Sequence, residues 1–277
     1  MINVNKLFRR LSIRAKLVIA FVLLGVIPLL VVGGYGAVYS FSLLSERLLD
    51  QIKFGVTTKA GEIQSFLSSV KEDVLFLSRL PTFQRLIDLP DGPNAARQPL
   101  VEQLGGEFVA FSRAHKAYYQ VRYIDQRGME AVRADFDGKQ SYLLPRDKLQ
   151  NKFDRYYFRE AIQISPGEVY VSPMDLNIEK GAVEIPYKPV VRYATPVINS
   201  RGVRKGIVII NIYASYVLGK VLALRRDEGG IVFLADNRGF YLSHSERAKA
   251  GGDYFSLTAD DNLKNDFPQP MADEILS

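Results

Sequence analysis

The chain has 277 residues, enough for one large or two small domains, with no cysteine and only two histidines. Disulfides and thiolate metal sites are therefore excluded, and a histidine-based zinc site is not expected. The net charge is +6, but five of the positive charges lie within residues 1–16, which contain no acidic residue. The nearly neutral remainder would make a poor phosphate-binding surface, so we expect no nucleic-acid partner.

An apolar segment without any charge, residues 17–41, follows the basic residues 1–16. About 20 apolar residues can cross a bilayer as a helix, and the basic flank of such a helix stays in the cytoplasm. The sequence thus predicts a cytoplasmic tail (1–16), a transmembrane helix (17–41) and export of the chain that follows. A cleaved signal peptide is the alternative, because residues 33–40 weakly match a cleavage site, but its apolar region would usually be shorter.

Residues 42–80 contain no proline, and apolar residues recur in them at helical spacing. Pro81 is a suitable stop signal, so we expect a stalk helix of roughly 60 Å, at ~1.5 Å per residue. Its apolar stripe could pack against this chain or against a second copy, and the second case predicts a homodimer. The stripe consists of Ile63, Phe66, Leu67, Val70, Val74 and Leu77.

Three tetrapeptides of the pattern Asp/Asn-x-Arg-Gly each separate two β-prone runs: residues 125–128, 199–202 and 236–239. The Asp or Asn side chain can accept hydrogen bonds from nearby backbone N–H groups, and Gly tolerates a positive φ. Each tetrapeptide therefore predicts a hairpin turn, although turn residues can also recur by chance. The first two turns indicate a module with an antiparallel sheet of about five strands (81–216). The third starts a similar second module (217–277), which is incomplete at its end.

An ordered set of short motifs resembles the double Cache sensor domains of bacterial transmembrane receptors. The motifs are "RYID..G.E.VR", "YF..A", "Y.SPMD", "P..PVVRYATPV" and "G.VIINI", and the resemblance covers residues 42 to the end. It implies an α+β fold: a transmembrane helix and a stalk helix followed by two PAS-like (Cache) antiparallel-sheet modules. In this family the membrane-distal module comes first in the chain and usually binds the ligand. The same input module occurs in sensor histidine kinases, chemoreceptors and diguanylate cyclases.

Three arginines lie within predicted strands: Arg122 and Arg133 on the first hairpin, and Arg192 within the apolar run 188–198. A half-buried arginine requires an anionic partner or a ligand. These arginines are therefore candidate ligand-binding residues. The alternative is that their strand face is exposed and the guanidinium groups are solvated.

The resemblance adds further candidates. The amino-acid-sensing branch of the family has Arg-x-Trp-Tyr before a short helix, where this chain has Arg155, Tyr157 and Phe158. That branch also uses an Asp for the ligand's ammonium group, and Asn211 stands at the matching position. The neutral Asn favours a carboxylate or another small polar metabolite as the ligand, although "YYF" could simply be core aromatics. Tyr170, Ser172 and Asp175 are additional candidates for the same pocket.

Motifs of enzymes and metal sites are missing from the sequence: there is no phosphate loop, G-x-S-x-G elbow, HExxH or EF-hand spacing. We therefore expect no catalytic residue, metal or cofactor in this region. The interpretation is an extracytoplasmic ligand-sensing region, most like the input half of a sensor histidine kinase, in the bacterial inner membrane. A membrane-anchored binding or scaffold protein without signalling output is the alternative.

Overall fold

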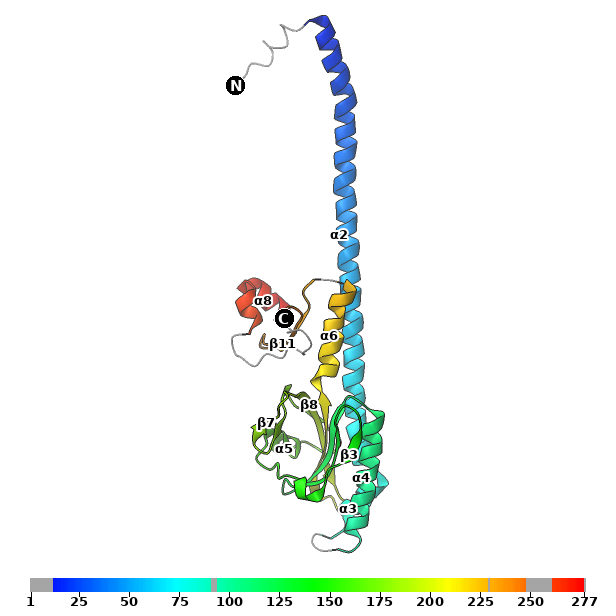
Figure 1. Cartoon of the computed structure of the whole chain (residues 1–277), viewed down its shortest axis with the longest axis vertical. Coiled ribbons are helices and arrows are strands. Elements are labelled where there is room, and N and C mark those ends of the chain that lie inside the picture. Colours follow the sequence, from blue (N-terminus) through cyan, green and yellow to red (C-terminus); the bar gives the residue numbers. More distant parts are fainter. Residues whose placement is uncertain (1–11, 91–93, 229, 248–260, 277) are drawn as a thin grey trace. The chain divides into compact units, whose positions relative to one another are not determined.

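The computed structural model describes residues 12–90, 94–228, 230–247 and 261–276 (Figure 1). Contacts divide the chain into two units, residues 1–57 and 58–277. The first unit contains the N-terminal part of helix α2, a single helix of 66 residues that runs from Ile13 to Ser78. Its apolar side chains in this unit are exposed, and the helix is long and apolar enough to cross a membrane.

The second unit is built on an antiparallel sheet of seven strands in the order β3-β2-β1-β9-β8-β4, with β5 also paired to β8. The sequence predicted about five strands, and the additional ones have only two or three residues. Two-residue strands carry too little alternation to be recognised in a sequence. The strands are β1 (Tyr118–Asp125), β2 (Glu130–Phe136), β3 (Ser141–Leu143), β4 (Tyr170–Val171), β5 (Asp175–Leu176), β8 (Pro189–Ile198) and β9 (Arg204–Tyr213).

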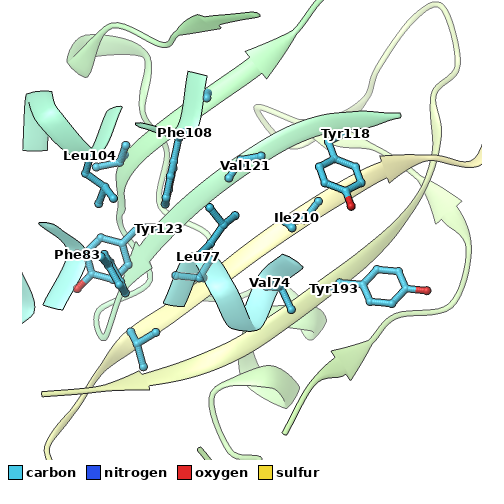
Figure 2. Packing of buried hydrophobic residues seen from close by; sticks show 14 of the residues in the cluster. Val74, Leu77, Phe83, Leu104, Phe108, Tyr118, Val121, Tyr123, Tyr193 and Ile210 are labelled. Atoms are coloured by element: carbon cyan, nitrogen blue, oxygen red, sulfur yellow. The ribbon is translucent and has the colours of Figure 1, made fainter. Parts of the chain in front are cut away.

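Helices cover one face of this sheet with an apolar core (Figure 2). Val74 and Leu77 of α2, Phe83 of α3 (Pro81–Asp88) and Phe108 of α4 (Arg97–Ala114) are fully buried there. They contact alternate residues of the central strands, because successive side chains of a strand point to opposite faces. Figure 2 shows Val121, Tyr123, Tyr193 and Ile210 among these strand residues.

This core decides what the apolar stripe of the stalk helix packs against. Val70, Val74 and Leu77 are fully buried within this chain, and Phe66 and Leu67 pack beside them. Of the two partners that the sequence left open, the structure therefore selects the chain's own sheet for this part of the stripe. The buried side chains of Val70, Val74 and Leu77 have no surface left for a second copy, whereas Phe76 on the same helix is exposed. The homodimer itself stays a prediction.

The three Asp/Asn-x-Arg-Gly segments form the same turn, which confirms the hairpin prediction. Asp125, Asn199 and Asp236 each use Oδ1 to accept hydrogen bonds from the backbone N–H groups two and four residues later. The fourth residue is a Gly with a φ of 78°, 77° or 91°. The turns join β1 to β2, β8 to β9, and β10 (Phe233–Ala235) to β11 (Tyr241–His244).

The first and third turns are also held from outside in the same way. Lys152 donates its backbone N–H to the carbonyl of Gly128 at 2.7 Å, and Leu263 donates to the carbonyl of Gly239 at 2.8 Å. Residues 151 and 262 form an isolated bridge to the residue after each glycine. The same local construction thus occurs twice in the chain, as expected for two related modules. The remaining elements are η1 (Arg146–Lys148), α5 (Tyr156–Ala161), β6 (Ile178–Glu179), β7 (Ala182–Val183), α6 (Ala214–Glu228), α7 (Leu263–Asp266) and α8 (Gln269–Leu276).

Candidate functional site

The face of the sheet opposite the helices is polar across its four central strands. Strand register places side chains from β2, β1, β9 and β8 in one row, and a second row lies beside it. All of these residues are at least 95% buried. Buried polar groups need partners, so this face is where a ligand could complete a network. The first row is Asp135, Gln120, Asn211 and Arg192, and the second begins with Arg133 and Arg122.

Arg122 and Arg133 lie directly opposite each other on neighbouring strands. Two like charges in this position are destabilising. Glu130, whose side chain is fully buried, accepts hydrogen bonds from Arg122 Nη1 at 3.1 Å and from Arg133 Nη1 at 3.5 Å through the same oxygen. Its other oxygen accepts from the backbone N–H of Gln150 at 3.0 Å. Glu130 is therefore the anion that lets the two arginines stand side by side.

Arg133 is fully engaged within the chain. It donates two hydrogen bonds of 2.8 Å to the two carboxylate oxygens of Asp135, and a third of 3.1 Å to Glu179. Burial alone would lower the pKa of Arg133, but these carboxylates outweigh it and raise the pKa. The structure thus places this predicted site residue in an internal ion-pair network.

Arg192 brings together two other predicted residues. Its Nη1 donates to Asp175 at 2.5 Å, and its backbone N–H donates to Ser172 Oγ at 3.0 Å. The hydroxyl of Tyr156 also donates to Asp175, at 2.5 Å. Burial, followed by the hydrogen bond to Asp175, raises the pKa of Tyr156 to about 12. Tyr156 thus stays protonated and donates at neutral pH.

Tyr157, the first buried residue of α5, lies among three guanidinium groups. The ring centroid of Tyr157 is 4.7 Å from Cζ of Arg192, and 5.8 Å from Cζ of both Arg122 and Arg155. A guanidinium within about 6 Å of an aromatic ring is attracted by the ring's negative face. The structure therefore gathers three predicted arginines, from β1, β8 and the N-cap of α5, around the ring of Tyr157, which is itself a predicted residue.

Arg155 differs from the other two arginines in its partners. Arg122 and Arg192 each pair with a carboxylate, whereas no carboxylate of the described residues lies within 4.0 Å of the Arg155 guanidinium. The Nε atoms of all three arginines are buried without a hydrogen-bond partner in the described part of the chain. Unpaired buried donors are uncommon in folded proteins, so donors gathered around one ring indicate a place for an acceptor.

The remaining predicted residues contact other residues of the chain around the Tyr157 site. Asn211 accepts from Arg122 at 2.8 Å and donates to Gln120 at 2.9 Å, so its amide positions Arg122. Phe158 is buried in a second apolar cluster, against which Tyr170 also packs. Burial and the nearby Glu160 raise the pKa of Tyr170. The other buried members of this cluster are Ile124, Tyr157, Ala161, Ala194, Ile207 and Ile209.

The hairpin around the third turn carries different residues at the matching positions. Phe233 and His244 are cross-strand partners placed around the third turn as Arg122 and Arg133 are around the first. Tyr241 follows its turn where Glu130 follows the first turn. Phe233 contacts Tyr241 and His244 with ring centroids 5.4 and 6.1 Å apart. Aromatic side chains thus replace the charged cluster, which makes the first module the candidate binding module.

The chain matches one family model in sequence and several solved structures in fold. Residues 50–273 match the family model described as bacterial histidine kinase, sensor domain. No curated protein matches the chain. The match to the family model covers most of the chain and concerns a sensor domain, which is not itself catalytic.

Several solved structures have the same fold. A domain of a sensory box/GGDEF family protein from Vibrio parahaemolyticus has a TM-score of 0.69 at 18% identity, over 83% of this chain and 84% of that one. The extracellular domain of a histidine kinase has a TM-score of 0.67 at 19% identity, over 83% and 80%. The sensory domain of the Campylobacter jejuni chemoreceptor Tlp3 with isoleucine bound has a TM-score of 0.53 at 15% identity, over 77% and 78%. These likenesses confirm the Cache-type fold, and the chain belongs to the family of bacterial histidine kinase sensor domains.

Proposed function

We propose that the first module binds a small metabolite through a carboxylate group, and that Arg155 and Tyr157 hold this group. The observation that carries the proposal is Arg155, a guanidinium at a buried aromatic ring with no carboxylate partner among the described residues. An arginine fork can grip a carboxylate through two parallel hydrogen bonds, and the ring supplies an apolar wall beside it.

Amino acids are one class of ligand to consider, because the Campylobacter jejuni chemoreceptor domain is described with isoleucine bound. An α-amino acid also needs an acceptor for its ammonium group. Asn211 is neutral and already bonded to Arg122 and Gln120, which supports a ligand without an α-amino group. Asp175 remains a partly exposed carboxylate near Arg192, so a more distant amine is compatible with the site.

For the whole receptor, we infer an N-terminus in the cytoplasm, α2 crossing the inner membrane and the two modules outside. Ligand binding can drive signalling only if the ligand has different affinities for two arrangements of the chain. The family match supports a histidine kinase output. We also propose that the receptor is a homodimer in the membrane. A membrane-anchored binding protein without output is the second candidate.

Arg155→Ala should abolish binding of small carboxylates without unfolding the protein. The full chain in detergent micelles would be screened by thermal shift against carboxylates, amino acids and amines. A ligand at ~100 times its Kd stabilises the wild type by roughly 2.7 kcal/mol. Loss of a buried charged contact costs ~2–5 kcal/mol of binding, enough to remove this shift.

Arg159→Ala is the matched control for this experiment, because Arg159 is exposed on the same helix. It should bind like the wild type. Normal carboxylate binding by Arg155→Ala would contradict the assignment of the site. A wild type that prefers α-amino acids over their deaminated analogues would contradict the interpretation of Asn211.

The proposed topology predicts opposite results for two reporter fusions. A reporter enzyme that is active only outside the cytoplasm should be active when fused after Leu100 and silent when fused after Lys16. The basic residues before the span supply the physical reason, because positively charged flanks are retained in the cytoplasm. The reverse pattern would place the sheet in the cytoplasm and exclude the receptor proposal.

A further inference from the structure

The carboxylate of Glu179 lies in a cluster of five donors, four from other parts of the first module and one, Asn177, two residues before it. One oxygen accepts from Gln150 Nε2 at 2.6 Å, Arg133 Nη1 at 3.1 Å and Lys152 Nζ at 3.4 Å. The other oxygen accepts from the side-chain amides of Gln120 and Asn177, each at 3.2 Å. The arrangement is that of a binding site for a carboxylate, already filled by a side chain.

This donor cluster needs an anion. Lys152 and Arg133 have side chains that are only 5% exposed, and burying an ammonium group without an opposite charge is strongly unfavourable. Burial and the neighbouring Arg122 lower the pKa of Lys152. Burial would by itself raise the pKa of Glu179, but Arg133, Lys152 and Arg122 outweigh it and lower the pKa well below its usual range. Glu179 is therefore ionised and supplies the required charge.

The segment that carries Glu179 forms no strand pair with the main sheet. Strands β6 and β7 form a separate two-stranded sheet, joined by a turn at Lys180 and Gly181, with φ values of 52° and 81°. An isolated two-stranded hairpin is marginally stable in water. Side-chain contacts with the body of the module are therefore needed to hold this hairpin in place. They include the Glu179 cluster, the Tyr119 hydroxyl that donates to Glu184 at 2.7 Å, and Gln150, which accepts from the Lys180 N–H at 2.9 Å.

The donor cluster also adjoins the Tyr157 site. Arg133, which donates to Glu179, is the cross-strand partner of Arg122, which lies at the ring of Tyr157. Gln120 donates to Glu179 and accepts from Asn211, which in turn holds Arg122. Replacing Glu179 by another carboxylate would therefore change the hydrogen bonds that position Arg122.

We propose that Gln120, Arg133, Gln150, Lys152 and Asn177 form a second subsite for a ligand carboxylate, and that Glu179 occupies it as a tethered substitute while no ligand is bound. An incoming carboxylate takes the place of Glu179, which removes one of the contacts that hold the β6–β7 hairpin, while the hydrogen bonds of Glu184 with Tyr119 remain. The exchange conserves charge in the buried cluster, since one carboxylate replaces another. The displacement of Glu179 by a ligand rests on the proposed function, whereas the subsite itself can be tested without Arg155.

Acetate, the free equivalent of the missing group, tests the subsite in the full chain in detergent micelles. Glu179→Ala removes the tethered carboxylate, so sodium acetate should raise the melting temperature of this variant in a saturable way, relative to sodium chloride at equal ionic strength. The wild type should not respond, because a tethered group acts at an effective concentration in the mM range or above. Glu168→Ala is the control, since Glu168 is an exposed carboxylate of the same module.

Two further variants keep the result decisive. Glu179→Gln preserves the size of the side chain, so it reports on the subsite if the alanine variant does not fold. Acetate should raise its melting temperature in the same direction as that of Glu179→Ala, but by less. Lys152→Met added to Glu179→Ala should remove the acetate shift, whereas Arg155→Ala added to it should leave the shift intact. The proposal is overturned if acetate affects the Glu179 variants no more than it affects Glu168→Ala, or affects the wild type equally. The two sites are separate if Arg155→Ala loses ligand binding while acetate still stabilises the variant that carries both Arg155→Ala and Glu179→Ala.

Discussion

Glu130→Ala should lower the free energy of unfolding by about 3–5 kcal/mol, the usual cost of removing one partner from a buried ion pair. The physical reason is the pair of cross-strand arginines: without the Glu130 carboxylate, Arg122 and Arg133 face each other, and Arg122 loses its only carboxylate partner among the described residues. Urea titration of the full chain, followed by far-UV circular dichroism, measures the loss.

Glu102→Ala is the matched control, because Glu102 is an exposed glutamate on α4 that accepts a hydrogen bond from Gln98 on the surface. Its cost should stay within about 0.5 kcal/mol, as for most surface substitutions. Glu130→Gln should fall between the two, since the amide keeps one acceptor oxygen but no charge. A cost below about 1 kcal/mol for Glu130→Ala would mean that water or another anion neutralises the two arginines.

The face of the sheet on which Glu130 lies could not be predicted from the sequence. Along β2, residues 132 and 134 face the helices while residues 133 and 135 face the polar side. By simple alternation Glu130 would join Val132 on the apolar face. The pairing skips Ala131, because Tyr123 pairs with Val132 and Ile124 pairs with Glu130. This β-bulge turns Glu130 towards the arginines, and a one-residue bulge leaves no reliable mark in a single sequence.

Other parts of the fold and of the candidate site are predictable because they depend on local patterns. The three turns follow from side-chain hydrogen bonding and from glycine at a positive φ, both set by residues within the turn. Arg122, Arg155, Tyr157 and Arg192 were singled out as candidates from the strand pattern and the motif resemblance. Their meeting around the ring of Tyr157 depends on how α5 packs on the sheet, which no local pattern specifies.

Glu179 and Lys152 were missed for the same physical reason. Both lie in segments without regular periodicity, in a short hairpin and in a loop, where a charged residue is normally expected to be exposed. Only the tertiary fold buries them, and only the partners around them show that Glu179 fills a site for an anion. Charged residues that become buried in irregular segments are thus the hardest part of this domain to predict from a single sequence.

The partner of the stalk stripe is a related case, because periodicity identifies an apolar face but not the surface that covers it. The structure covers Leu77 with the chain's own sheet. Leu77→Ala should therefore lower the free energy of unfolding by about 2–5 kcal/mol, the range for a leucine truncated in a close-packed core. The loss should be the same at every protein concentration, because an intrachain contact does not depend on a second copy.

Leu49→Ala is the matched control on the same helix, since Leu49 is 66% exposed and alanine is an equally good helix former. It should change the stability by less than about 0.5 kcal/mol when the chain is dilute in detergent. Chemical unfolding over a hundredfold range of protein concentration measures both variants. A cost of Leu77→Ala that grows with concentration would mean that the stripe packs between copies after all. A concentration-dependent cost confined to Leu49→Ala would instead place the contact between copies on residues 42–59, because the core around Leu77 is complete within one chain.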